Sequence, residues 1–523
     1  MVLWSLIFAT FLSFQRVMRG DLEIVVDNRL LVQTNCSNLH LTTERVINYT
    51  AGDGYLVESD NVSVTIRRLE QSACVVKYEM FPVHKRHLRG QVCADPYLMY
   101  QDYIFDTNID MAWTLKGPHE TSVIIVDDGI GSHRDIVVAE RFPVSLAYFG
   151  DHSNSVASVA AGESNNVGLC GANGDSRVVD INLLANDFIS DLSESMAFEG
   201  IHYEYNAVYC NSWGPTDDGR CEGTGHMFAT TLRTKIATGR QGLGCIYVFA
   251  AGNGGSDENV NDDGYANNPY TLAVAASHNR DPASFSEWGA CIAVTAPGYQ
   301  LLAAGPDDRF KYFYGTSAAA PIIAGIVTIL LSINPNLYWY DVHEIVMVST
   351  KIISTGWSYN AAERRYHYAL GSGMADANRA ARLAETWIPT TRRANVSQTI
   401  EGGRRPLPVL AAFDMQEGVV VEQVVVCVSL HGNSSSGASV GAWVQSPFGT
   451  RAILTRPTTR VSLIAGCVYR DWCFTSLTQR GEEGRGRWIF FAESSEGESV
   501  VFQSLRLDLL GSTEPFSPYG CVE

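Results

Sequence analysis

The most restrictive feature of this 523-residue chain is a long apolar run from Ser317 to Leu331, entered through Gly315 and Thr316. Small and aliphatic residues in this pattern predict a buried helix that begins beside Ser317. Gly315 permits a tight entry, and Pro321 is expected in the first turn, where its missing N–H breaks no helical hydrogen bond. A serine there faces unpaired backbone N–H groups and the positive end of the helix dipole. The same pattern also fits an ordinary helix capped by Thr or Ser, so the serine needs partners elsewhere before it indicates chemistry.

Three further segments contain polar residues at positions that suit an active site. The β-branched run 123–126 is typical of a strand buried in a parallel sheet, and it ends in Asp127. The run 245–250 predicts a second buried strand, and Asn253 follows it. His152 precedes a stretch of small residues, which suits a helix in the centre of a domain. In open α/β sheets, active sites gather at the carboxyl ends of the strands, so we expect an active site at that edge.

Acyl transfer requires a nucleophile, a base within hydrogen-bond reach of it, a carboxylate that orients the base, and donors for the oxyanion. The candidates for these four roles are, in the same order, Ser317, His152, Asp127 and Asn253. The chain order Asp, His, Ser is the one found in subtilisin. An α/β-hydrolase esterase is disfavoured, because no Gly-x-Ser-x-Gly motif surrounds the candidate serine.

From about Asp95 to Gly511 the sequence resembles the subtilisin-like serine proteases of the kexin/furin proprotein convertase branch. The serine motif Gly-Thr-Ser is typical of subtilases in general. The Asn-Ser-Trp-Gly-Pro-Thr-Asp-Asp-Gly and Asp-Gly-Tyr motifs, at 211–219 and 263–265, indicate the convertase branch. Other matching segments are 127–130, 242–244, 251–255 and, in the last third of the chain, 444–450 and 471–472.

The fold class that follows is α/β. Alternating buried strands and helices predict a doubly wound, mostly parallel sheet, and the resemblance implies that it is subtilisin-like. A β-rich pattern after it resembles the all-β sandwich called the P-domain, and a small α/β propeptide is expected before it. The predicted parts are a signal peptide (1–20), a propeptide (21–86), a catalytic domain (87–392), a P-domain (393–511) and a tail (512–523).

The chain is expected to be exported and processed. The apolar run from Val2 to Phe14 is too short to span a bilayer and is typical of a signal peptide. The dibasic pair Lys85-Arg86 stands where the family places its maturation cut, and Arg89 is the second choice. No stable membrane span is expected, because the longest later apolar stretch is assigned to the core helix.

Composition supports export and disfavours some partners. The formal net charge of −18 argues against nucleic acid and anionic membranes. Twelve cysteines, without a C-x-x-C pair or zinc-like spacing, suit an oxidising compartment. Cys210 and Cys245 are not expected to pair, because the predicted strands put them at opposite edges of a parallel sheet. Five Asn-x-Ser/Thr sequons agree with the secretory pathway: Asn35, Asn48, Asn61, Asn395 and Asn433.

The resemblance leaves the disulfide pattern open. Cys170 and Cys291 match cysteines that pair in the family, but their usual partners, expected near Arg309 and Asn261, are absent. Either new pairs form or these thiols stay unpaired.

The resemblance also places acidic residues around the substrate. Asp217 and Asp263 match positions that line the pocket for the residue just before the cut, and Asp128 matches a carboxylate that faces the preceding residue. A cationic side chain in a cleft needs carboxylates to replace its hydration, so these positions imply basic substrates. The other substrate-binding positions that match are Trp213, Gly214, Glu222 and Tyr265, with Glu194 as a weaker addition.

Calcium is the implied cofactor, since hard oxygen ligands scattered over loops suit calcium better than zinc. One implied site consists of Asp95, Asp135 and Asn166. A second site, behind the basic pocket, consists of Asp217, Glu287 and either Glu258 or Asp257.

The match to the family fails around the catalytic histidine. This chain has Ser153-Asn154 where the family has Gly-Thr, and the interval between Asp127 and His152 is much shorter than in furin-like enzymes. A loop that contains further acidic residues is missing there, and Asp151 is a candidate to replace one of them.

The first functional hypothesis is a secreted, calcium-dependent serine endoprotease that cleaves proproteins after paired basic residues. It would mature by cutting itself near Arg86, with its propeptide as inhibitor and chaperone. The alternative is a catalytically weak, convertase-like protein that binds basic segments in its acidic cleft. An exported subtilase of broad specificity is disfavoured by Asp217 and Asp263.

Overall fold

The computed structural model divides the chain into two compact units, Met1–Gly90 and Gln91–Glu523. The described residues are 14–19, 22–34, 45–49, 54–58, 69, 75–82, 93–143, 150–184, 189–199, 207–389, 393–432, 440–456, 469–494 and 500–513. The predicted maturation site at Lys85-Arg86 and its alternative Arg89 lie outside the described residues. The sequons at Asn35, Asn61 and Asn433 lie outside them as well.

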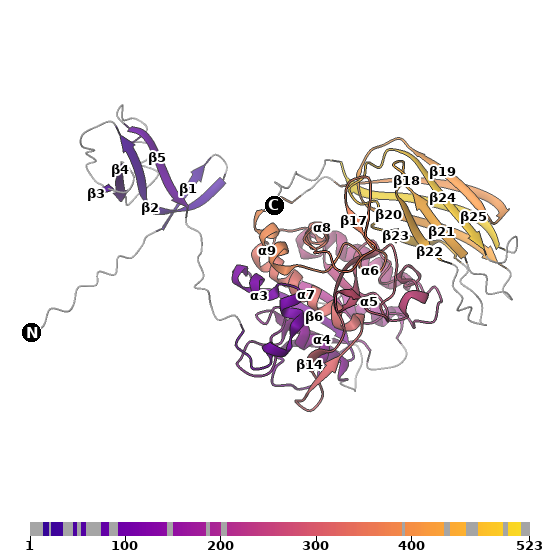
Figure 1. Cartoon of the computed structure of the whole chain (residues 1–523), viewed down its shortest axis with the longest axis horizontal. Helices are drawn as coiled ribbons and strands as arrows, with labels where there is room; N and C mark the ends of the chain where they lie inside the picture. The colour runs from indigo at the N-terminus through magenta and orange to yellow at the C-terminus, as the bar shows by residue number, and fades with distance from the viewer. Residues whose placement is uncertain are drawn as a thin grey trace, which may run out of the picture. The chain divides into compact units, whose positions relative to one another are not determined.

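The N-terminal unit contains an antiparallel sheet of five strands in the order β1-β2-β4-β3, with β5 also paired to β2 (Figure 1). The strands are β1 (Phe14–Arg19), β2 (Leu22–Thr34), β3 (Arg45–Tyr49), β4 (Gly54–Glu58) and β5 (Val75–Pro82). The sequence ranges 22–26, 55–66 and 73–78 are strand-like and overlap β2, β4 and β5, with 59–66 and 73–74 outside the described residues. The first strand, β1, lies within the stretch predicted as a signal peptide, and the sequon Asn48 lies on β3.

An eight-stranded sheet forms the centre of the second unit, in the order β12-β11-β10-β9-β6-β8-β7 with β13 beside β11. Its pairings are parallel except that of β12 with β11, as the doubly wound prediction requires. The strands are β6 (Ser122–Asp127), β7 (Val138–Pro143), β8 (Arg177–Asn182), β9 (Ala207–Asn211), β10 (Ile246–Ala250), β11 (Thr271–His278), β12 (Asp281–Pro282) and β13 (Ile292–Pro297).

Helices cover both faces of this sheet, which explains why its strands are apolar without alternation. In β6, Val123 and Ile125 pack into one core cluster, and Ile124 and Val126 pack into another. The first cluster includes side chains from α2 (Asp102–Asp106), α3 (Ile109–Ala112), α4 (His152–Ala161), α7 (Thr316–Ile333), α8 (Trp339–Val348) and α9 (Ala377–Thr386). The second includes side chains from α5 (Asp191–Glu199) and α6 (His226–Thr238).

Short elements connect these layers. Two antiparallel hairpins are formed by β14 (Leu301–Ala304) with β15 (Phe310–Phe313), and by β16 (Ser358–Tyr359) with β17 (Arg365–Tyr366). The 3-10 helices are η1 (Leu98–Tyr100), η2 (Trp113–Leu115), η3 (Arg240–Gly242), η4 (Gly255–Asp257) and η5 (Val260–Asp262).

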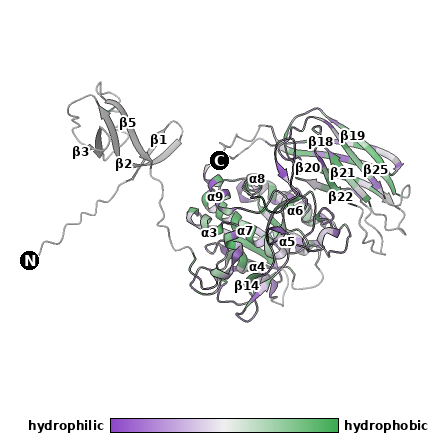
Figure 2. Cartoon of the chain, viewed as in Figure 1, coloured by the Kyte–Doolittle hydropathy of each residue, from purple (hydrophilic) through white to green (hydrophobic). Residues whose placement is uncertain are grey.

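Helix α7 is the apolar helix that the sequence predicted, and Figure 2 shows its hydrophobic colour at the centre of the domain. Among the described residues it is the one helix with the length and hydropathy of a membrane span, and 89% of it is buried inside the domain. The expectation for Pro321 is wrong, because the helix begins at Thr316 and the proline lies beyond its first turn. A proline there leaves the Ser317 carbonyl without its helical donor. The hydroxyl of Ser212 donates to that carbonyl instead, at 3.0 Å.

A β-sandwich of two four-stranded sheets follows, in the orders β18-β25-β20-β23 and β19-β24-β21-β22. The strands are β18 (Arg393–Pro406), β19 (Val409–Met415), β20 (Val420–Gly432), β21 (Val440–Gln445), β22 (Arg451–Thr455), β23 (Trp472–Ser476), β24 (Gly486–Ser494) and β25 (Val500–Ser512). Six strand-like ranges of the sequence, 419–430, 442–446, 451–454, 471–477, 487–492 and 500–510, correspond to β20 to β25, whereas β18 and β19 were missed. Strand β18 lies at a sheet edge and contains Gly402-Gly403 and many polar residues, which explains why its pattern was not recognised.

The sandwich meets the α/β domain through buried polar contacts. Arg480 is buried and its Nη1 lies 2.9 Å from Glu344 Oε2 on α8. The Asn360 amide donates to the carbonyl oxygens of Thr478 and Arg480, at 2.9 and 2.8 Å. Because a buried charge or amide is costly unless it is paired, these contacts define one arrangement of the two domains.

Two disulfides answer the question that the resemblance left open. Cys170 bonds to Cys93, and Cys427 bonds to Cys473 in the sandwich. Cys291 is a buried thiol, as is Cys210, so the expectation that Cys210 does not pair with Cys245 is confirmed.

Candidate active site

The structure brings Asp127 and His152 together. Asp127 ends β6, and His152 is the first residue of α4. The imidazole Nδ1 lies 2.9 Å from Oδ1 and 3.0 Å from Oδ2 of the carboxylate, which is buried. Oδ1 also accepts the backbone N–H of Asp128, at 2.8 Å. The carboxylate is therefore fixed by its own chain and can in turn orient the imidazole.

Strand β15 contributes two residues to the surroundings of His152. Phe313 packs against the imidazole edge to face, with the ring centroids 5.3 Å apart. Lys311, two residues earlier, contacts Asp151 with its Nζ 2.7 Å from Oδ2. Burial lowers the pKa of His152, but the charge and hydrogen bond of Asp127 outweigh it and leave that pKa raised, while Lys311 opposes the rise.

Ser317 is the second residue of α7, as the sequence predicted. Its hydroxyl donates to the Ser212 carbonyl at 3.1 Å, and the Ser212 hydroxyl donates back to the Ser317 carbonyl. A hydroxyl has one proton, so nucleophilic attack requires that this proton be passed to His152 instead. Such rearrangements are common, because catalytic hydrogen bonds often tighten only when substrate is bound.

Asn253 follows β10 and lies against the N-terminus of α7. Its Oδ1 accepts the backbone N–H of Thr316 at 2.9 Å and the Thr316 hydroxyl at 3.2 Å. These contacts fix the oxygen end of the amide, so the Nδ2 end is left as a donor. Gly315 makes this approach possible, because a Cβ at that position would lie 3.2 Å from Asn253 Oδ1. An oriented amide beside a helix N-terminus suits an oxyanion.

The predicted basic-binding residues gather beyond Asn253. The Asp217 carboxylate accepts the Asn253 backbone N–H at 2.9 Å. Asp263 is half-buried, and its Oδ1 accepts the backbone N–H groups of Tyr265 and Ala266 at 2.7 and 3.2 Å. Burial raises the pKa of Asp263 to about 7, and the charges of Asp217 and Glu222 add to the rise. Clustered carboxylates whose charges raise the pKa of Asp263 form a site that a cation would stabilise.

The remaining substrate-binding candidates surround this cluster. Gly214 passes close to Asp263, since a Cβ on it would lie 3.0 Å from Oδ2. The Tyr265 hydroxyl donates to Glu194 at 2.8 Å, and its ring packs edge to face on Trp213, with centroids 5.1 Å apart. Glu222 is exposed and forms a β-bridge with Asp263.

Two acidic candidates near His152 have local partners. Asp128 is half-buried, and its Oδ1 accepts the Ser153 backbone N–H at 2.9 Å. Burial raises the pKa of Asp128, and the neighbouring charge of Asp127 raises it further. Asp151 is the candidate to replace a missing acidic residue, and its carboxylate forms an ion pair with Lys311.

Comparisons with known proteins agree with this geometry. Residues 119–376 match the model of the subtilase family. Yeast (Saccharomyces cerevisiae) kexin is 29% identical over 380 residues, which cover 68% of this chain and 46% of kexin. Proprotein convertase subtilisin/kexin type 4 of Rattus norvegicus is 28% identical, with 82% of this chain and 69% of that protein covered. An endoprotease bli of Onchocerca volvulus is 28% identical, with 79% of this chain and 66% of that protein covered.

Residues 119–376 form a subtilase-family domain. Its fold is shared with a serine protease of Aeromonas sobria, whose crystal structure in complex with its chaperone gives a TM-score of 0.71 at 19% identity. That comparison covers 80% of this chain and 96% of the other. The comparison extends beyond the residues that the family model matches.

The first predicted metal site contains two unsatisfied carboxylate oxygens. Asp95 Oδ1 and Asp135 Oδ1 are both buried without a hydrogen-bond partner. Burial raises the pKa of Asp135 to about 7, and the charge of Asp95 adds to the rise. Asn166 is exposed, and its backbone N–H donates to Asp95. Two buried, mutually repelling carboxylates with unpaired oxygens fit a hard cation such as calcium.

The second predicted metal site lies behind the acidic cluster. Burial raises the pKa of Glu287 to about 10, with contributions from the charge of Asp217 and a hydrogen bond to it. Glu258 and Glu287 both lie against Gly254. A Cβ at that position would be 1.9 Å from Glu258 Cγ and 3.1 Å from Glu287 Oε1. These three carboxylates fit a cation, whereas the alternative Asp257 is exposed.

Sequence reasoning missed three residues of this site. Phe313 and Lys311 lie in a hairpin that has no motif, and their roles depend on the path of β15 beside α4. Ser212 belongs to a recognised motif, but its bond to the Ser317 carbonyl depends on where α7 begins. Of these, only Ser212 had a signal in the sequence, namely the proline four residues after Ser317.

Proposed function

We propose that this protein is a serine endoprotease that cleaves other proteins after basic residues, preferably paired ones. The observation that carries the proposal is the combination of the Asp127–His152 pair, Ser317 on the N-terminus of α7, and an acidic cluster next to Asn253. The relatives named for kexin and convertase activity support the paired-basic specificity. The chain spans 66% of the Onchocerca volvulus endoprotease and 46% of kexin, so its activity is proposed for the chain as it stands.

The chemistry follows from the geometry. Ser317 Oγ attacks the carbonyl carbon of the scissile bond, while its proton passes to His152 Nε2. Asp127 stabilises the imidazolium through Nδ1. The oxyanion accepts hydrogen bonds from Asn253 Nδ2 and from backbone N–H groups at the start of α7. His152 then gives its proton to the leaving amine, and water hydrolyses the acyl-enzyme by the same route in reverse.

Specificity arises from the acidic cluster. An arginine side chain before the cut would replace its water with the carboxylates of Asp263 and Asp217. The raised pKa of Asp263 supports this assignment, because a bound guanidinium would offset the burial and the neighbouring negative charges that cause it. Asp128 is the candidate for the residue one position further back, and Glu222, Tyr265, Trp213 and Gly214 complete the cleft.

Calcium is the proposed cofactor, held by Asp95 and Asp135 at one site and by Asp217, Glu258 and Glu287 at the other. Calcium would supply positive charge to buried carboxylates and stabilise the native state.

A chelator should therefore lower the Tm. If the free calcium concentration before chelation is 100 times the Kd, the loss of stability is about 2.7 kcal/mol. Asp135→Asn should make part of this dependence disappear. A Tm that is the same with calcium and with chelator would contradict the cofactor assignment.

Self-maturation in the secretory pathway is also proposed, with a cut after Lys85-Arg86 or, as the second choice, Arg89. The N-terminal sequence of the secreted protein tests it, wild type beside Ser317→Ala. The expected result is a start at His87 in the wild type and a retained propeptide in the variant. Cleavage of both at His87 would mean that another protease performs the cut.

The competing function is a protein that binds basic segments with little catalysis. One observation favours it, namely that the Ser317 hydroxyl donates to Ser212 rather than to His152. Absence of cleavage in both proteins, together with binding of a dibasic peptide, would support this function over the protease.

A further inference from the structure

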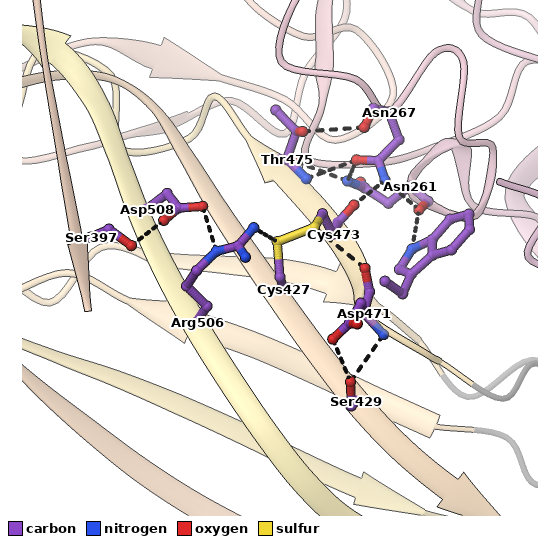
Figure 3. The surroundings of a disulfide bond; sticks show 11 residues. Asn261, Asn267, Ser397, Cys427, Ser429, Asp471, Cys473, Thr475, Arg506 and Asp508 are labelled. Atoms are coloured by element: carbon purple, nitrogen blue, oxygen red, sulfur yellow. Dashed lines mark hydrogen bonds and ion pairs between the residues drawn. A yellow bond between two sulfur atoms is a disulfide. The ribbon is translucent and has the colours of Figure 1, made fainter. Parts of the chain in front are cut away.

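The loop that contains the specificity residues Asp263 and Tyr265 is bordered by two asparagines, and both reach into the sandwich. Asn261 precedes Asp263 by two residues, and Asn267 follows it by four. Both are buried, Asn261 in the short 3-10 helix η5 and Asn267 in the loop that follows. Figure 3 shows them beside Cys473 and Thr475 of β23. Because a buried amide must be paired, their partners define what holds this loop.

Asn261 connects three parts of the chain. Its Oδ1 accepts the Ala290 backbone N–H at 2.8 Å. Its Nδ2 donates to Asn267 Oδ1 and to the Thr475 carbonyl, both at 2.8 Å. Its own carbonyl accepts the Trp472 indole N–H at 3.1 Å. Both polar atoms of the Asn261 side chain therefore have partners within the protein, and neither is left to contact a substrate.

Asn267 pairs with β23 as a neighbouring strand would. Its Nδ2 donates to the Cys473 carbonyl at 2.7 Å, and its Oδ1 accepts the Thr475 backbone N–H at 2.7 Å. Strand β23 lies at the edge of its sheet, so these backbone groups have no strand partner on that side. The amide of Asn267 thus satisfies the edge of the sandwich and ties the loop to it.

The position of the Asp263 carboxylate depends on the same loop. Its Oδ1 is held only by the backbone N–H groups of Tyr265 and Ala266, and its carbonyl accepts the Asn267 N–H at 2.9 Å. The carboxylate therefore follows the backbone between the two asparagines. A displacement of this backbone would move the charge relative to Ser317 without touching the nucleophile.

We propose that the sandwich is a positioning element for substrate selection, and that Asn261 and Asn267 are the positioning residues through which it fixes Asp263. Neither asparagine touches the substrate; each acts through the loop. The proposal rests on the proposed protease function and adds that recognition of the basic residue depends on the second domain. The catalytic groups are held within the α/β domain and do not require these contacts.

The test compares two peptides that are identical except for arginine or citrulline before the cut, since citrulline keeps the shape and removes the charge. The full chain is used, and the active fraction is measured with a fluorophosphonate that labels the reactive serine. Asn261→Ala and Asn267→Ala should lower the arginine-to-citrulline ratio of kcat/KM by about tenfold, because small misplacements of binding groups have large effects. Their kcat/KM for the citrulline peptide, per labelled serine, should stay at the wild-type value.

Two further variants keep the result unambiguous. Trp472→Phe removes only the indole N–H that is donated to Asn261, so it should lower the same ratio by a smaller factor. It replaces the asparagine variants as the test if those fail to fold. Gln445→Ala breaks a hydrogen bond in the other sheet of the sandwich, donated by Arg451 at 3.2 Å, that does not reach the loop, and its ratio should match the wild type. The proposal would be overturned if folded Asn261→Ala and Asn267→Ala kept the wild-type arginine-to-citrulline ratio of kcat/KM and lost only part of the serine that the fluorophosphonate labels. A wild type without any arginine preference would overturn the proposed function as well.

Discussion

The two ends of the candidate active site are built differently. At the reacting end, Asp127, His152 and Ser317 come from β6, α4 and α7, which all contribute side chains to one apolar core. At the pocket end, Asp263 lies in a loop whose neighbours bond to the sandwich. With the proposed function, the comparison teaches that the bond-breaking groups would depend on the α/β domain alone, whereas substrate selection would be shared between two domains.

The two ends also differ in charge. At the reacting end, Asp127 pairs with the imidazole and Asp151 with Lys311, so two of the three carboxylates there have a basic partner and Asp128 is the third. The pocket end is acidic throughout, and several of its carboxyl groups have raised pKa values because burial and mutual repulsion oppose their ionisation. The first is arranged to move a proton, and the second is arranged to receive a cation.

The largest expected effect is that of Ser317→Ala at the reacting end. Removal of the nucleophile from a comparable triad lowers kcat by about 10⁶-fold, and we expect a loss of that order. The variant should bind the arginine peptide as tightly as the wild type, because the pocket end is untouched. Equilibrium binding beside single-turnover kinetics measures both, and retained cleavage would show that Ser317 is not the nucleophile.

Asn253→Leu should have the next largest effect. Loss of one oxyanion donor lowers kcat by roughly 10²- to 10³-fold. KM should change little, since Asn253 Nδ2 acts on the transition state. Steady-state kinetics with a single peptide separate the two constants, and a rise in KM at unchanged kcat would place Asn253 in the pocket instead.

Asp263→Asn sharpens the comparison from the pocket side. It keeps the shape of the side chain and removes the charge, so kcat/KM for the arginine peptide should fall by about 100-fold, the usual scale for a lost buried charge pair. The citrulline peptide should be cleaved as well by the variant as by the wild type. An equal loss for both peptides would mean that Asp263 supports the fold rather than selection.

The smallest expected effect is that of Lys311→Met. His152 must be neutral to act as base, and its raised pKa places the rise of kcat/KM with pH at a midpoint above its usual value of about 6.5. Lys311 opposes this rise, so its removal should move the midpoint upward. The ion pair is partly exposed, and its removal should change kcat/KM at neutral pH by no more than about fivefold. A pH–rate profile measures the midpoint, and a downward shift would contradict the assignment.

Much of the fold was predictable because its signals are local. Continuous apolar strands such as 123–126 and 246–250 are typical of a sheet covered on both faces, and the helix at Thr316 followed from its composition. The catalytic candidates were recognised because each follows such a strand or begins a helix. The strand β18 was missed because an edge strand with polar residues lacks that periodicity.

The contacts that tie the pocket to the sandwich were not predictable from the sequence. Asn261 was noticed only as a position without a cysteine, yet its amide bonds to Ala290, Asn267 and Thr475. Those partners are distant in the chain, and an asparagine in a loop is usually part of a turn. The ion pair between Lys311 and Asp151 was not predictable either, because it depends on the path of β15 beside α4.

The most direct test of the account measures kcat/KM of the purified full chain for the matched arginine and citrulline peptides, with Ser317→Ala as control. The account predicts cleavage after arginine by the wild type, a preference over citrulline of about 100-fold, and no cleavage of either peptide by the variant. Equal cleavage of both peptides, or cleavage by the variant, would contradict it.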